Sequence, residues 1–105
     1  MRKPWHFHPE AHKELIEAAE YYERKKLGLG DAFLSEFDAA LNGLEDAPSA
    51  AAPMSRLSSE LRARRWFVPR FPYAIVFVEL EHEFRIVAVA HLHRRPGYWN
   101  VRLER

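Results

Sequence analysis

The stretch from Arg70 to Trp99 decides the fold of this chain. It reads RFPYAIVFVEL over residues 70–80, a short charged turn EHE over 81–83, and FRIVAVAHLHRRPGYW over 84–99. Two apolar runs rich in Val, Ile, Phe and Tyr, joined by so short a polar turn, predict an antiparallel hairpin whose strands lie inside a sheet. The two ends of such a hairpin lie side by side. Residues about twenty apart in the sequence therefore converge on one edge of the sheet.

Two amphipathic helices are predicted upstream of the hairpin. The first spans residues 9–26 and begins at Pro9, since the first helical position is the one that best tolerates proline. Gly28 suits a left-handed turn, and Asp31 is placed to cap a second helix over residues 31–46. Because the connection is so short, the two helices must run antiparallel.

Shorter strands are expected on either side of the helices. Residues 4–8 (PWHFH) alternate and predict a first strand, with Trp5 and Phe7 on one face. Residues 61–68 (LRARRWFV) resume strand character, and the two prolines that follow mark the bend into the hairpin. If the alternation is regular, one face of this strand carries Arg62, Arg64, Trp66 and Val68.

These elements predict an α+β fold in one domain, residues 1–105. The N-terminal two-helix hairpin packs on one face of a small antiparallel sheet of three to four strands, with the first strand at an edge. We expect the strands Tyr73–Leu80 and Phe84–His91 at the centre, and the opposite sheet face open. Residues 47–60 are expected to form a surface loop. The tail, residues 100–105, is too short and too charged for a core element.

Length and composition fit a small globular domain. At 105 residues there is room for one hydrophobic core, in which we expect Phe37 and Ile86 because both fall on the apolar phase of their elements. With 48% hydrophobic and 30% charged residues, the chain is not a disordered tail. No apolar run approaches the roughly 20 residues of a membrane helix, and no signal peptide is evident, so we expect a cytoplasmic protein. The absence of cysteine excludes disulfides, thiolate metal sites and a cysteine nucleophile.

The net charge of +1 conceals two differently charged halves. Residues 1–55 hold 6 basic and 10 acidic side chains (net −4), and residues 56–105 hold 10 basic side chains, all Arg, and 5 acidic ones (net +5). Arginine suits the bidentate recognition of carboxylates and phosphates. The alternative is that most of these arginines are solvated residues of strand faces and the tail. A protein that cleaves RNA by electrostatics alone should be more basic than this.

Both halves of the sequence resemble one known family. RFPYAIVF (70–77) followed by AVAHLHRRPGYWNVR (88–102) resembles the C-terminal half of the RelE/ParE superfamily, the toxins of bacterial type II toxin-antitoxin modules. HPEAHKELIEAAEYYERKKLGLGDAFLSEF (8–37) resembles the opening helical hairpin of that family. The Phe-Pro-Tyr and Arg-x-Pro-x-Tyr-Trp segments are closer to the ParE-like plasmid stabilisation branch than to the RelE ribonucleases. The resemblance covers nearly the whole chain.

The resemblance implies a toxin that is neutralised by a cognate antitoxin, with two different modes of action. A ParE-like toxin blocks DNA gyrase by binding and is not an enzyme. A RelE-like toxin is a ribosome-dependent, metal-independent endoribonuclease that cleaves messenger RNA. The near-neutral charge, the missing C-terminal lysines and the Tyr-Trp ending favour the first mode. A toxin-like binding module without toxicity is a third alternative, and none of the three needs a cofactor.

One group of residues could carry RNA cleavage. The reaction needs a base for the 2′-hydroxyl, cations for the charged phosphorane and an acid for the leaving oxygen. The resemblance implies that a RelE-like site would use Arg70 and Arg94 for phosphate and Tyr98 as its late tyrosine. The convergence of the hairpin ends adds His91 as a further catalytic candidate. Tyr73 would lie close to them. The alternative is structural, with Tyr73 packed in the hairpin and His91 and Arg94 bonded to the C-terminal turn.

A second group could form a partner surface. An exposed sheet face flanked by arginine would receive an acidic, disordered antitoxin segment. The candidate contacts are Arg62, Arg64, Trp66 and Trp99, since Trp and Arg are preferred at interface hot spots. The alternative is that both tryptophans are buried in the fold.

Histidine pairs give a weaker signal for metal binding. His6 and His8, like His91 and His93, each put two imidazoles on one strand face. Neither pair has a cysteine or a local carboxylate beside it, so we expect no metal site.

Overall fold

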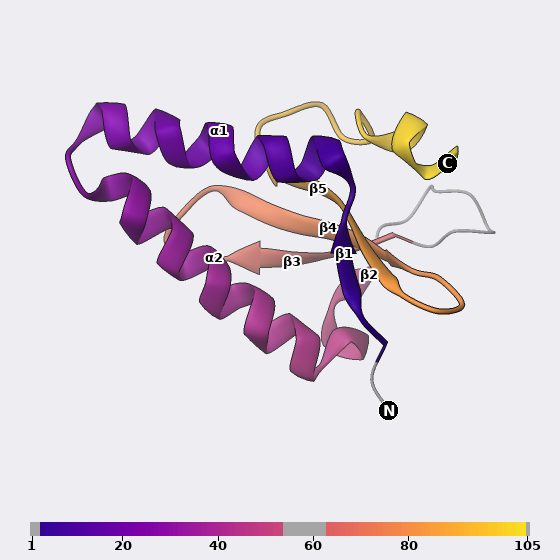
Figure 1. Cartoon of the computed structure of the whole chain (residues 1–105). Coiled ribbons are helices and arrows are strands. Elements are labelled where there is room, and N and C mark those ends of the chain that lie inside the picture. Colours follow the sequence, from indigo (N-terminus) through magenta and orange to yellow (C-terminus); the bar gives the residue numbers. More distant parts are fainter. Residues whose placement is uncertain (1–2, 54–62, 105) are drawn as a thin grey trace.

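A computed structural model describes residues 3–53 and 63–104 (Figure 1). The elements in chain order are β1 (Trp5–Phe7), α1 (Pro9–Lys25), α2 (Leu29–Asp46), the 3-10 turn η1 (Pro48–Ala50), β2 (Ala52–Pro53), β3 (Arg64–Val68), β4 (Tyr73–Glu79), β5 (Phe84–His91) and the 3-10 helix η2 (Asn100–Glu104). No helix in the described ranges is long and apolar enough to cross a membrane.

The sheet confirms the predicted hairpin and extends it. Its strand order is β1-β5-β4-β3-β2, with β1 parallel to β5 and every other neighbouring pair antiparallel. The sheet thus has five strands where three to four were expected, because the two-residue strand β2 has too short a pattern to predict. The first strand lies at an edge, as expected.

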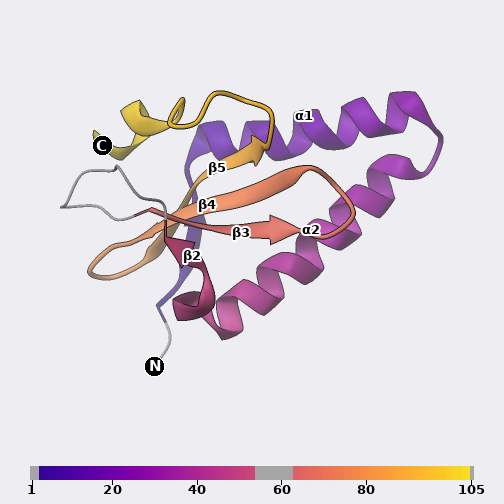
Figure 2. The ribbon, with the colours of Figure 1, turned by 180° about the vertical axis from the view of Figure 1, so that it is seen from behind.

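Both helices pack antiparallel on one face of this sheet, as Figures 1 and 2 show. Phe37 of α2 and Ile86 of β5 lie in the shared core and are 1% and 0% exposed. Trp5 and Phe7 also pack against this core, whereas His6 is exposed. The predicted phase of both helices and of the first strand is therefore confirmed.

The start of α2 differs from the prediction. Gly28 adopts the expected left-handed backbone (φ 88°), but the helix begins at Leu29, and Asp31 lies in its first turn without capping it. The carboxylate of Glu23 on α1 accepts from the backbone N–H groups of Gly28 and Gly30, both at 2.9 Å. The cap comes from the preceding helix, so Asp31 is not needed for it.

The sheet face away from the helices is partly covered, where an open face was expected. Trp99 is 1% exposed and packs with Val76, Val87 and Ala88, and Leu103 of η2 packs against the same cluster. The C-terminal segment thus turns back beside β5 (Figure 2) and contributes to a second core. The expectation that residues 100–105 form no core element was wrong for Leu103.

A bulge interrupts β5 at Val87. Val76 pairs with Ala88, but Phe77 pairs with Ile86, so Val87 has no partner residue on β4. The extra residue changes which backbone groups face the edge of the sheet. β1 pairs with β5 only at Phe84, Arg85 and Ile86, which leaves the groups beyond the bulge to find other partners.

Candidate functional site

The side chain of Glu14 on α1 joins the N-terminal and C-terminal parts of the chain. Its Oε1 accepts hydrogen bonds from the Val89 backbone N–H and from Arg102 Nη1, both at 3.0 Å. Its Oε2 accepts from the Tyr98 hydroxyl and from Arg102 Nη2, both at 2.9 Å. Arg94 Nη1 lies 3.4 Å from the same oxygen. We call Glu14, Arg94, Tyr98 and Arg102 the Glu14 network.

The network completes the edge of the sheet. Where β1 no longer covers β5, the Val87 carbonyl accepts from Arg102 Nη1 at 2.9 Å, and the Val89 N–H donates to Glu14. A buried backbone group without a partner is costly, so two side chains here do what a neighbouring strand does elsewhere. The bulge at Val87 explains why these groups face the edge.

Tyr98 is held in its neutral form. Burial raises the pKa of its hydroxyl well above the ordinary value, and the hydrogen bond to Glu14 raises it further. The guanidinium of Arg94 stacks 3.7 Å from the centroid of the Tyr98 ring, and that of Arg102 lies at 5.2 Å. The phenol therefore keeps its proton through the physiological range.

Arg102 remains charged although it is largely buried. Burial by itself lowers the pKa of Arg102, but the hydrogen bonds and the charge of Glu14 outweigh that effect, and the pKa is raised. The side chains of Arg102 and Glu14 are 12% and 11% exposed, so the ion pair is largely shielded from water.

The structure brings most of the predicted catalytic group together. Tyr73 and His91 are cross-strand neighbours in edge contact, with ring centroids 5.1 Å apart. His91 Nδ1 accepts from the His93 backbone N–H at 3.0 Å. Arg94 and Tyr98 stack within the Glu14 network. His91 and Arg94 line the same open hollow beside α1, whose volume is about 210 Å³.

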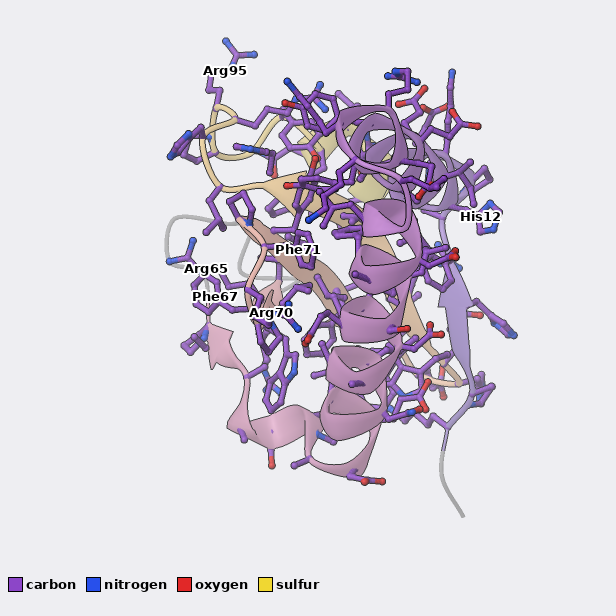
Figure 3. The ribbon with its side chains drawn as sticks, turned by 90° about the vertical axis from the view of Figure 1, so that its left-hand side faces the viewer. His12, Arg65, Phe67, Arg70, Phe71 and Arg95 are labelled. Carbon is purple, nitrogen blue, oxygen red and sulfur yellow. The ribbon has the colours of Figure 1, made fainter. Side chains whose placement is uncertain are left out.

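Arg70 points elsewhere. It adopts a left-handed backbone (φ 72°) in the β3–β4 turn and pairs with Glu36 of α2 at 2.9 Å. Figure 3 shows its side chain on the side of α2. The convergence of the hairpin ends therefore unites Tyr73 with His91, but it does not bring Arg70 into the Glu14 network.

The predicted partner contacts divide between the surface and the core. Arg64 donates to the Pro48 carbonyl at 3.4 Å, and Trp66 packs partly buried against the helix-side core. Trp99 is buried in the second core, which favours the structural alternative for its side chain. Arg62 lies outside the described residues.

A small hollow lined partly by arginine lies between the sheet and the C-terminal turn (residues 92–99). It is on the sheet face opposite α1 and α2, which we call the helix-free face. Its volume is about 60 Å³. The lining residues are Arg65, Ala74, Val76, Ala90, His91, Leu92, Arg94, Arg95, Pro96, Tyr98 and Trp99.

The histidine pairs have other partners. His6 Nδ1 lies 3.3 Å from a Glu83 carboxylate oxygen, and His8 Nδ1 accepts from the Glu10 backbone N–H at 3.1 Å at the start of α1. In the described part of the chain, no three His, Asp or Glu side chains are grouped so that they could hold a metal ion.

Comparison with solved structures agrees with the architecture. A chain of the chromosomal ParDE TA system from P. aeruginosa superposes with a TM-score of 0.69 at 13% identity, over 87% of this chain and 97% of that one. At that identity the likeness shows a shared fold, two helices on one face of a small sheet. No curated protein matches the sequence.

The family is given by the sequence itself. Residues 6–96 match the family described as the ParE toxin of the type II toxin-antitoxin system, parDE. The chain belongs to this ParE toxin family.

The two residues at the centre of the Glu14 network, Glu14 and Arg102, were not among the predicted site residues. Arg102 lies in the tail that was expected to form no core element. The signal was present in the helical spacing, because Glu14 lies three residues after Ala11 and four before Ala18, both of which are buried. A lone carboxylate on an apolar face indicates a buried partner.

Proposed function

We propose that this ParE-family toxin arrests growth by binding DNA gyrase, acts in the cytoplasm, and is neutralised by a cognate antitoxin. Membership of the ParE toxin family supports the toxin-antitoxin assignment. The structural relative comes from a ParDE system, which supports a partner protein of the ParD kind.

One observation favours binding over catalysis: two arginines and the tyrosine of the C-terminal segment, Arg94, Arg102 and Tyr98, are engaged with Glu14. Arg94 and Arg102 both pair with this carboxylate, and Tyr98 donates to it. A metal-free ribonuclease needs cations aimed at the phosphorane and groups free to exchange protons. Tyr98, whose pKa is raised by burial and by Glu14, is a poor base and a poor acid at neutral pH.

The position of Arg70 supports the same choice. A phosphate held between Arg70 and Arg94 would have to draw one guanidinium away from Glu36 on α2 and the other away from Glu14 on α1. Cleavage of messenger RNA is the alternative function, and the following experiment distinguishes it from gyrase binding.

Inducible expression in bacteria, with two separate readouts, tests the proposal. We expect gyrase-dependent DNA breaks with intact transcripts. Arg94→Ala should leave the transcripts intact as well, because no cleavage depends on it. Transcripts that are cut by the wild type and spared by Arg94→Ala would overturn the proposal in favour of the ribonuclease.

A further inference from the structure

The hollow on the helix-free face is produced by two small side chains. Ala74 of β4 pairs directly with Ala90 of β5, and Ala74 pairs on its other side with Phe67 of β3. Cross-strand neighbours lie about 5 Å apart. The large ring of Phe67 on β3 is therefore followed across the sheet by the methyl groups of Ala74 and Ala90. Val76 and the buried Trp99 also line the hollow. The hollow is therefore an apolar depression in the sheet.

Arginine surrounds this depression. Arg65, Arg94 and Arg95 line it, and no carboxylate does among the described residues. Neither Arg65 nor Arg95 forms an ion pair with another described residue, and the guanidinium of Arg65 rests 5.1 Å from the Phe67 ring. In Figure 3 the side chains of Arg65, Phe67 and Arg95 lie on the side of the ribbon away from α2. Two cations are thus free to meet an incoming anion.

The rim also exposes apolar surface. Phe67 is 49% exposed and Leu92 is 44% exposed. Large apolar side chains left in water beside unpaired cations are typical of a protein interaction site. The fitting partner carries both an aliphatic side chain and acidic residues.

The lining of the hollow favours a peptide over a nucleic acid. Beneath the arginines it is apolar, with Ala74, Ala90 and Trp99, which suits an aliphatic side chain. The net charge of +1 is also low for a nucleic-acid surface.

We infer that this hollow docks an acidic, extended segment of the antitoxin: an aliphatic side chain enters between Ala74, Ala90 and Trp99, and flanking carboxylates pair with Arg65 and Arg95. The inference rests on the proposed function, because the antitoxin is the partner named there. It adds the surface and the chemistry by which the partner is recognised.

The probe is the protein whose gene adjoins that of this chain and that protects cells from it. Its affinity for the full chain is measured by calorimetry at two salt concentrations. We expect Arg65→Glu and Arg95→Glu each to weaken binding about tenfold or more, with the loss greatest at low salt. Ala90→Leu should weaken it comparably without changing any charge, because the new side chain fills the hollow.

Lys13→Glu is the matched control. Lys13 is exposed on α1, so the same charge reversal away from the hollow should change the affinity by less than about twofold. Thermal midpoints identify any variant that fails to fold. Arg65 and Arg95 are both exposed, so their variants should keep the wild-type midpoint.

Three results would overturn the docking site. The first is wild-type affinity in Arg65→Glu, Arg95→Glu and Ala90→Leu. The second is loss of single-stranded RNA binding in these variants while antitoxin binding is kept. The third is loss of self-association of the antitoxin-free chain in the same variants, again with antitoxin binding kept. Gyrase inhibition is measured in parallel, so a failure of the gyrase proposal is seen separately from a failure of the docking site.

Discussion

The carboxylate of Glu14 and the guanidinium of Arg102 form two parallel hydrogen bonds, Oε1 to Nη1 at 3.0 Å and Oε2 to Nη2 at 2.9 Å. The two residues are 88 positions apart in the sequence, and both side chains are largely buried. This bidentate arrangement is the strongest geometry available to such a pair. It fixes the C-terminal helix η2 to α1 and to the free edge of β5.

Removing the charge of Glu14 should destabilise the fold strongly. We expect Glu14→Gln to lower the free energy of unfolding by about 3–5 kcal/mol at neutral pH, because Arg102 is left buried without a counter-charge. Denaturant titration measures the loss. Glu36→Gln, which breaks the pair with the 71% exposed Arg70, should cost no more than about 1 kcal/mol. Equal losses in the two variants would contradict a structural role for the Glu14 network.

Tyr98 should contribute stability that disappears at high pH. The pKa of Tyr98 is raised in the folded state, so the protonated phenol stabilises the native state. This stabilisation is fully present below the unfolded pKa of about 10. It is lost as the pH rises from there towards the folded pKa. The difference in unfolding free energy between the wild type and Tyr98→Phe should therefore shrink above pH ~10. Tyr22 and Tyr73 also have raised pKa values, but they are present in both proteins and cancel. A difference that does not change with pH would count against this assignment.

The core between the helices and the sheet should lose stability when a buried side chain is removed from either one. Phe37→Ala in α2 and Ile86→Ala in β5 should each cost about 2–5 kcal/mol, since each removes a fully buried side chain and leaves a cavity. Unfolding of either variant at the wild-type midpoint would show that the packing of α2 on the sheet is not as described.

Two glycines of α2 should respond in opposite directions to the same substitution. A Cβ at Gly30 would lie 2.6 Å from the Ala19 backbone oxygen, so Gly30→Ala must separate the helices and should cost about 1–3 kcal/mol. At Gly43 the nearest atom, in Trp66, is 3.6 Å away, so Gly43→Ala should stabilise the helix by about 0.5–1 kcal/mol. Calorimetric unfolding compares the two. A stabilising effect at Gly30 would refute the close helix contact.

The elements with a strong local period could be predicted from the sequence. The β4–β5 hairpin follows from two β-branched apolar runs around a three-residue turn, and α1 and α2 follow from their apolar stripes. Pro9 also marks the start of α1 correctly. In each case the pattern that predicts the element lies inside the element.

The missed features depend on contacts between distant residues. The role of Arg102 is visible only beside Glu14, and the cap of α2 comes from Glu23 on the preceding helix. The bulge at Val87 cannot be read from an apolar run, because every residue around it is apolar. The prediction that Arg70 joins His91 and Arg94 was based on the antiparallel direction of the hairpin strands and on the family resemblance. The left-handed backbone at Arg70 and the carboxylate of Glu36 turn the side chain towards α2.

A supercoiling assay with purified gyrase and the purified chain tests the proposed binding of gyrase most directly. We predict dose-dependent loss of supercoiling that is reversed by the antitoxin, with messenger RNA left intact when the same preparation is added to translating ribosomes. Undiminished supercoiling together with ribosome-dependent cleavage of the messenger RNA would contradict the account.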